Sequence, residues 1–132
     1  MKVSLAESTV VGFIPSTDLN VAREFYSDVL GLELSQSDEY ALEYRMKGAK
    51  LRVAKVNELS LKRHTIFGWE VADIDHAVAS LAGNGVRFER FDGMSQNEQG
   101  VCSFPGGGKV AWFRDPEGNT LSITQVGSES QG

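Results

Sequence analysis

The sequence predicts an α+β fold of two tandem β-α-β-β-β modules, forming a curved eight-stranded mixed sheet with an open cleft and both helices outside. The first observation behind this prediction is an internal repeat. Residues 11–18 resemble residues 66–73, which lie 55 positions later, and an apolar helix pattern follows each copy. The second observation is a matching hairpin glycine, Gly48 in the first copy and Gly118 in the second. A repeat of this length is typical of a supersecondary unit that packs against its own copy.

The chain of 132 residues has the length of one compact domain. We expect a single domain over residues 1–132, with module one at about 9–56 and module two at about 64–126. The polar, glycine-containing segment 127–132 is expected to be a disordered tail. No proline-rich or low-complexity linker divides the two modules.

In the first module, β-rich residues 9–14 predict a strand, and Ser16, Thr17 and Asp18 are candidate N-caps for the helix that follows. Apolar residues recur at helical spacing from Val21 to Leu30, and Gly31 is a candidate C-cap. Strands are then predicted over residues 32–37, 40–46 and 49–56.

The second module repeats this plan, with a strand over residues 65–71 and a helix from Ile74 that stops at Gly83. Strands are predicted over residues 86–91, 110–114 and 120–125, with a short extended piece at 101–104. Residues 92–109 contain five glycines and few apolar side chains, so they are expected to form a mobile flap in which Met94 and Phe104 close onto a ligand.

Composition limits the classes of function. The net charge of −5 and the absence of a basic cluster argue against nucleic acid and anionic membranes as partners. No apolar run reaches the roughly 20 residues of a membrane helix. Cys102 is the single cysteine, so no intrachain disulfide forms, and a structural role is favoured over a nucleophilic one. A reducing cytoplasm is the expected compartment.

Three segments carry a family resemblance when they are taken in this order on the repeat. They are residues 25–32 (FYSDVLGL), 69–75 (WEVADID) and 113–119 (FRDPEGN). With them the chain resembles the vicinal oxygen chelate superfamily of glyoxalase I, extradiol dioxygenases, and bleomycin- and fosfomycin-resistance proteins. One fold hosts many functions, so the resemblance supports the fold more than an activity. It also implies a homodimer.

The resemblance implies a divalent metal held by His and Glu from the first and last strands of both modules. Those four positions carry Val11, Arg52, Ile66 and Ser122 in this sequence. Two have no donor atom, the guanidinium repels a cation, and a lone hydroxyl is a poor ligand. We therefore expect no metal and no other cofactor.

Other residues offer a poor replacement for these ligands. His64 and Glu70 share a strand face, but about 20 Å separates them at roughly 3.3 Å per residue. Glu43 on a neighbouring strand could add a carboxylate. A polar role at the start of a strand is favoured for His64.

What remains is a concave face with apolar walls and few polar groups, which suits a small organic ligand. Arg52 could bind a carboxylate or a similar anion, or it could pair with Glu43 and neutralise the face; both readings stay open. Strand parity leaves the direction of Trp112 ambiguous. The candidate ligand-binding residues are Val11, Phe13, Glu43, Arg52, His64, Ile66, Ser122 and Thr124.

The favoured function is binding of a small organic ligand by a metal-free member of this superfamily, as in its bleomycin-resistance branch. The alternative is a metal-dependent lyase or dioxygenase of glyoxalase type with an atypical site. A third reading is a purely structural or regulatory domain. No catalytic residue can be named.

Overall fold

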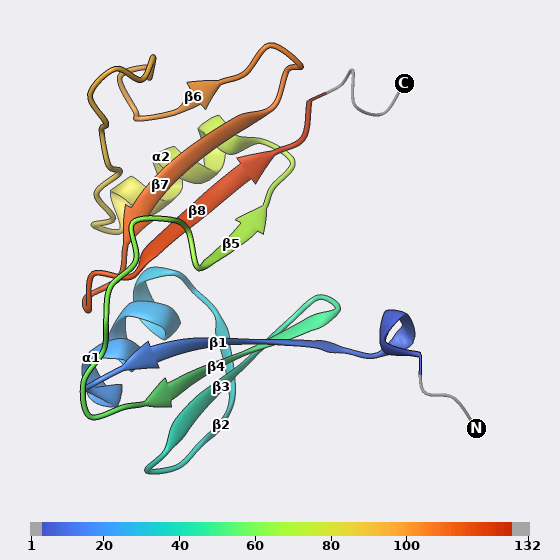
Figure 1. Cartoon of the computed structure of the whole chain (residues 1–132), viewed down its shortest axis with the longest axis vertical. Coiled ribbons are helices and arrows are strands. Elements are labelled where there is room, and N and C mark those ends of the chain that lie inside the picture. The colour runs from blue at the N-terminus through green and yellow to red at the C-terminus, as the bar shows by residue number, and fades with distance from the viewer. Residues whose placement is uncertain (1–3, 128–132) are drawn as a thin grey trace. The chain divides into compact units, whose positions relative to one another are not determined.

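The structure is a computed structural model and describes residues 4–127. The chain divides into two compact units, Met1–Ser60 and Leu61–Gly132, and each unit holds a four-stranded sheet (Figure 1). Each sheet combines one parallel pair with two antiparallel pairs. The predicted α+β fold with tandem β-α-β-β-β modules and eight strands is confirmed.

The first unit follows the predicted element order. It contains η1 (Leu5–Glu7), β1 (Val10–Ser16), α1 (Leu19–Arg23), η2 (Glu24–Val29), β2 (Glu33–Ser37), β3 (Ala41–Met46) and β4 (Ala49–Lys55). The strand order β1-β4-β3-β2 places β1 at one edge of the sheet, parallel to β4. A parallel pair needs a long crossover connection, and the helical segment together with the β2–β3 hairpin supplies it.

The first helix differs from a regular α-helix in its second half. Residues 24–29 form a wider π-helical turn, in which the Leu30 N–H donates to the carbonyl of Phe25 at 2.9 Å. Tyr26 from this turn is fully buried and lies 6.1 Å from Tyr44 of β3, measured between ring centroids. Gly31 ends the helix with a φ of 75°, as its C-cap position predicts.

The second unit contains β5 (Phe67–Glu70), α2 (Ile74–Gly83), β6 (Cys102–Ser103), β7 (Lys109–Arg114) and β8 (Thr120–Gln125), in the sheet order β5-β8-β7-β6. Its core is aromatic. Phe113 is fully buried, stacks on Trp69 with ring centroids 6.4 Å apart, and meets Phe88 edge-on at 5.5 Å. Trp69 therefore packs in this aromatic cluster.

The internal repeat is preserved in the backbone. Asp18 and Asp73 cap the two helices with nearly the same dihedrals, φ −142°, ψ 99° and φ −135°, ψ 97°. The two parallel pairs also share a register. Phe13 pairs with Arg52 in the first unit, and Gly68, which stands 55 positions after Phe13, pairs with Ser122 in the second.

The predicted strand over residues 86–91 is wrong. Within it, only Phe88 forms a β-bridge, opposite Phe113 of β7. The chain then leaves the sheet and returns at Cys102, which pairs with Val110 of the same strand. The edge position next to β7 is therefore occupied first by Phe88 and then by β6. Residues 89–101 connect these two pieces, and we call this connection the excursion.

Two predictions concern the termini and membranes. Gly127, placed in the expected disordered tail, is buried, and residues 128–132 lie outside the described residues. Within residues 4–127, no helix has both the length and the apolar character needed to cross a membrane.

Candidate ligand-binding site

Three predicted site residues of the first unit lie side by side across neighbouring strands. Phe13 of β1 pairs with Arg52 of β4, which pairs with Glu43 of β3. Leu51 and Val53, the strand neighbours of Arg52, are fully buried, so Arg52 projects from the opposite, open face. Phe13 is 62% exposed there, and the side chain of Arg52 is 35% exposed.

Glu43 is the electrostatic centre of this face. Its Oε1 accepts a hydrogen bond from Arg52 Nη1 at 3.0 Å, and its Oε2 lies 3.8 Å from Lys50 Nζ. Ser35 Oγ lies 3.2 Å from the same Oε2 and donates to the Glu43 backbone carbonyl at 3.1 Å. The structure therefore forms the Arg52–Glu43 pair that the sequence left open. Because two cations share one carboxylate, the Lys50–Glu43–Arg52 group keeps a net positive charge.

The second unit presents a different open face. Ser122 and Thr124 of β8 alternate with the buried residues Leu121 and Ile123, and Ser122 itself is 6% exposed. The register places Trp112 directly opposite Ser122, which resolves the ambiguity over Trp112. Its indole ring meets Phe91 edge-on, with ring centroids 5.3 Å apart.

Val11 lies beside the first group: it is 41% exposed, pairs with Lys50, and stands two residues before Phe13 on β1. The other two predicted residues precede β5. Ile66 precedes β5 and donates its N–H to the Thr120 carbonyl at 2.9 Å. His64 is an exposed residue of the connection before β5, whereas its polar reading placed it at the start of a strand.

The side chains present do not fit the metal that the resemblance implies. Val11 and Ile66 supply no donor atom, Arg52 is a cation hydrogen-bonded to Glu43, and Ser122 offers one neutral hydroxyl. Among the described residues, no group of three or more His, Cys, Asp or Glu side chains could hold a metal ion elsewhere.

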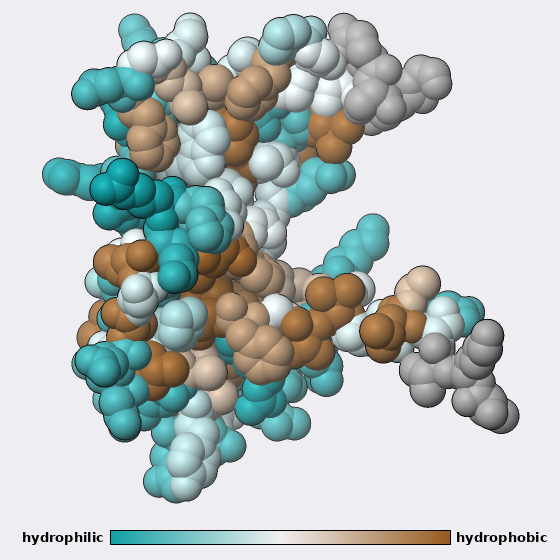
Figure 2. Space-filling view, in the orientation of Figure 1, coloured by the Kyte–Doolittle hydropathy of each residue, from teal (hydrophilic) through white to brown (hydrophobic). Residues whose placement is uncertain are grey.

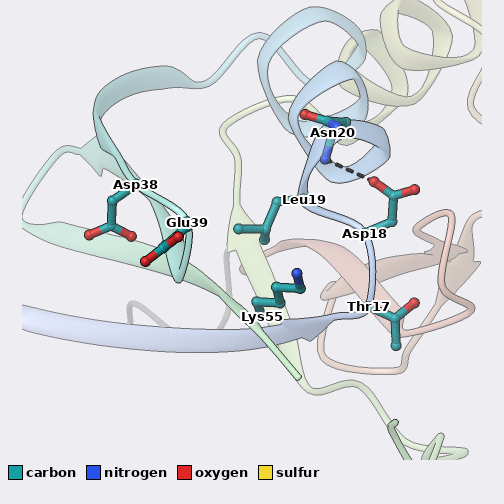
Figure 3. Close-up of a pocket in the computed structure, with 7 residues that line it drawn as sticks. All are labelled: Thr17, Asp18, Leu19, Asn20, Asp38, Glu39 and Lys55. Atoms are coloured by element: carbon teal, nitrogen blue, oxygen red, sulfur yellow. Dashed lines mark hydrogen bonds between the residues drawn. The ribbon is translucent and has the colours of Figure 1, made fainter. Parts of the chain in front are cut away.

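A separate surface pocket of about 390 Å³ lies in the first unit (Figure 3). It is lined by Thr17, Asp18, Leu19, Asn20, Asp38, Glu39 and Lys55. Asp18 and Asp38 already accept backbone hydrogen bonds, from Asn20 and Val21 and from Tyr40 and Ala41 respectively. Two of its three carboxylates thus have a structural role, and we assign the pocket no ligand.

The expected flap is held more firmly than its composition predicts. Gln96 Nε2 donates to the carbonyls of Glu89 and Gly100 at 2.9 and 2.7 Å, and its Oε1 accepts the Phe91 N–H at 2.8 Å. Arg90 Nη1 donates to the Asn97 carbonyl at 2.8 Å. These bonds close the neck of the excursion, while Met94 and Phe104 remain 39% and 48% exposed. Closure of the flap onto a ligand stays a prediction.

Sequence reasoning missed three contributors to these faces: Ser35, Lys50 as a partner of Glu43, and Phe91. Trp112 could have been placed by counting across the turn, because Arg114 pairs with Thr120 and the register then sets Trp112 opposite Ser122. The contact of Phe91 with Trp112 depends on the path of the excursion, which leaves no periodic signal in the sequence.

Comparison with known proteins identifies the family of this chain. The model of the Glyoxalase/Bleomycin resistance protein/Dioxygenase superfamily matches residues 8–123. The chain belongs to this superfamily, so the family resemblance is confirmed. No functionally curated protein matches it.

Solved structures support the fold. A glyoxalase/bleomycin resistance protein/dioxygenase from Nocardioides is 18% identical, with a TM-score of 0.71 over 96% of this chain and 87% of that one. A glyoxalase family protein from Bacillus anthracis is 14% identical, with a TM-score of 0.72 over 96% and 99%. A lactoylglutathione lyase from Agrobacterium tumefaciens is 17% identical, with a TM-score of 0.69 over 90% and 93%. At these identities the likeness concerns the fold.

Proposed function

We propose that this protein binds a small organic anion without a metal, using the open faces of its sheets. The observation that carries the proposal is the set Val11, Arg52, Ile66 and Ser122 at the positions where metal-dependent relatives would hold ligands. A protein with these side chains has lost the means to bind a cation but keeps an apolar face with polar groups. Such a face suits a small organic ligand.

The local charge of the Lys50–Glu43–Arg52 group favours an anion. Arg52 and Lys50 share the single carboxylate of Glu43, and the Arg52 guanidinium has five N–H donors, of which the Glu43 contact uses Nη1. A ligand carboxylate could therefore bond to Arg52 while the Glu43 pair stays in place. The exposed ring of Phe13, opposite Arg52, adds apolar surface for the body of the ligand.

A thermal-shift screen of small carboxylates tests the proposal, because a ligand that binds the native state alone must raise the melting temperature. Hits are then compared by calorimetry between wild type and Arg52→Ala. A charge-assisted hydrogen bond contributes about 1.5–3 kcal/mol, so we expect affinity to fall by roughly ten- to a hundredfold. Arg87→Ala removes an exposed arginine of the second unit and is the matched control.

Two outcomes contradict the proposal. In the first, no carboxylate stabilises the wild-type protein. In the second, Arg52→Ala binds the same carboxylates as tightly as wild type and Arg87→Ala do.

A further inference from the structure

We infer that a patch of the second unit binds the planar ring of an aromatic ligand and donates a hydrogen bond to an acceptor on that ring. The patch consists of Gly68, Phe91, Trp112 and Ser122 and is called the Trp112 patch. The inference rests on the proposed function, because it names the ligand class for one of the open faces. It is carried by an unusual hydroxyl, a glycine that makes room for it, and a half-buried indole beside it.

The hydroxyl of Ser122 is the first observation. Ser122 is one of six buried polar residues, and the side chains of the other five all take part in hydrogen bonds within the protein. Among the described residues, Ser122 Oγ has no such partner. In the part of the chain that the structure describes, however, every side-chain N or O atom that is closed to solvent has a hydrogen-bond partner. The Ser122 Oγ therefore reaches the surface from an otherwise buried residue.

The burial of Ser122 favours binding of a ligand acceptor by its hydroxyl. Its residue is already 94% removed from water, so little further desolvation is needed when a ligand covers it. A polar group that is covered without a partner loses free energy, and an acceptor on the ligand prevents that loss. A carbonyl or carboxylate oxygen is therefore the group we place against Ser122.

Gly68 keeps this hydroxyl accessible. It pairs with Ser122 across β5 and β8 and is itself exposed. A Cβ atom at position 68 would lie 2.6 Å from Ser122 Oγ and 2.9 Å from the Ser122 carbonyl oxygen. Both distances are shorter than normal contacts, so any other residue at position 68 would displace or cover the hydroxyl. Because Gly68 has a negative φ, the backbone conformation does not require glycine here, and the close approach does.

Trp112 supplies the surface for a ring. It lies opposite Ser122 on the other side from Gly68, and the edge-on contact with Phe91 holds its indole. Phe91 is fixed in turn by the bond from its N–H to Gln96. Two rings held in this way lose little conformational freedom when a planar ligand stacks on them, and aromatic contacts add about 0.5–1.5 kcal/mol beyond area burial.

The test uses benzoate and cyclohexanecarboxylate, which carry the same acceptor on a planar and a non-planar ring. Trp69→Phe leaves Trp112 as the single tryptophan, so its fluorescence reports binding at the patch. We expect benzoate to change this fluorescence and to bind about two- to tenfold more tightly than cyclohexanecarboxylate. Ser122→Ala should weaken benzoate by roughly fivefold to tenfold.

Two control variants separate the patch from general damage. Gly68→Ala should weaken benzoate at least as much as Ser122→Ala, whereas Gly83→Ala, where an added Cβ meets no atom within 4 Å, should not. Ser103→Ala removes an exposed hydroxyl and should also leave binding unchanged. If Gly68→Ala fails to fold, Ser122→Ala and the comparison of the two acids still decide the question.

The outcomes also separate this inference from the proposed function. If benzoate binding depends on Arg52 but not on Ser122 or on ring planarity, the proposed function stands and the Trp112 patch is wrong. If binding depends on Ser122 but not on Arg52, the patch stands and the anion site at Arg52 is wrong. If neither acid binds, the Trp112 patch is wrong, and the wider carboxylate screen decides the proposed function.

Discussion

Glu43 is the only acidic member of the Lys50–Glu43–Arg52 group and sets its net charge. Its carboxylate is 11% exposed and faces Arg52 and Lys50. Glu43→Gln leaves two neighbouring cations without a counter-charge, so we expect the free energy of unfolding to fall by about 1–2 kcal/mol. Urea denaturation measures this loss.

The same substitution should tighten anion binding, because Arg52 loses its protein partner. Glu39→Gln, at an exposed position, is the control and should change neither quantity. Unchanged stability in Glu43→Gln would show that the ion pair contributes nothing. Weaker anion binding would show that Glu43 positions Arg52 rather than competing with the ligand.

Residue-scale predictions from the sequence succeed where strand parity sets the answer. Strand parity accounts for the burial of Leu51, Val53, Leu121 and Ile123, because alternate residues of a half-covered strand face the core. The pairing of Arg52 with Glu43 could not be decided from parity. It depends on the register of β3 against β4 and on competition between protein and ligand for one guanidinium.

At the scale of elements, a buried phenol links β3 to the first helix. Tyr44 is fully buried, and its hydroxyl lies 2.9 Å from Ser27 Oγ of η2. Burial raises the pKa of Tyr44, an effect that the Ser27 hydrogen bond and the charge of Arg23 partly offset. The folded state therefore holds the phenolic proton more tightly than the unfolded chain does.

This raised pKa predicts a loss of stability at alkaline pH. Below about pH 10 the phenol is protonated in the unfolded chain as well. In this range the protonated Tyr44 makes its full contribution to the free energy of unfolding. As the pH rises further, the unfolded chain releases its proton first and stability declines. Denaturation between pH 8 and 11 should show a steeper decline for wild type than for Tyr44→Phe, with Tyr40→Phe, at an exposed position, behaving like wild type. Equal slopes in wild type and Tyr44→Phe would refute the linkage.

Gln96 makes three of the side-chain hydrogen bonds at the neck of the excursion. Gln96→Ala removes three hydrogen bonds, so we expect hydrogen exchange in residues 89–101 to rise by at least about tenfold while β8 is unaffected. Gln99→Ala changes an exposed glutamine of the same loop and is the control. If both variants exchange like wild type, the Gln96 side chain does not hold the neck.

The excursion also shows where elements cannot be predicted from sequence. Residues 86–91 have the composition of a strand, but β7, their pairing partner, also pairs with β6. The chain therefore leaves the sheet after Phe88. Side-chain bonds from Gln96 and Arg90 fix that path, and such bonds leave no periodic pattern. The helix caps Asp18 and Asp73 were predictable because capping is local.

At the scale of the whole molecule, we propose that two copies of the chain pair through β1. This strand lies at the edge of its sheet, and apolar surface gathers over it (Figure 2), with Leu5 82%, Val10 64% and Phe13 62% exposed. An exposed apolar edge strand promotes association, and a defined partner prevents aggregation.

Light scattering at micromolar concentration should give twice the mass of one chain. Val10→Lys should reduce this to one chain mass, whereas Val21→Lys, which places the same charge at an exposed position of α1, should not. A wild-type protein with the mass of one chain would contradict the proposal.

The central claim, anion binding without a metal, is tested most directly by calorimetric titration of the tightest-binding carboxylate into protein before and after treatment with a chelator. The donor set Val11, Arg52, Ile66 and Ser122 predicts the same dissociation constant in both samples. Loss of binding after chelation, restored by adding Zn²⁺, Ni²⁺, Mn²⁺ or Fe²⁺, would contradict it.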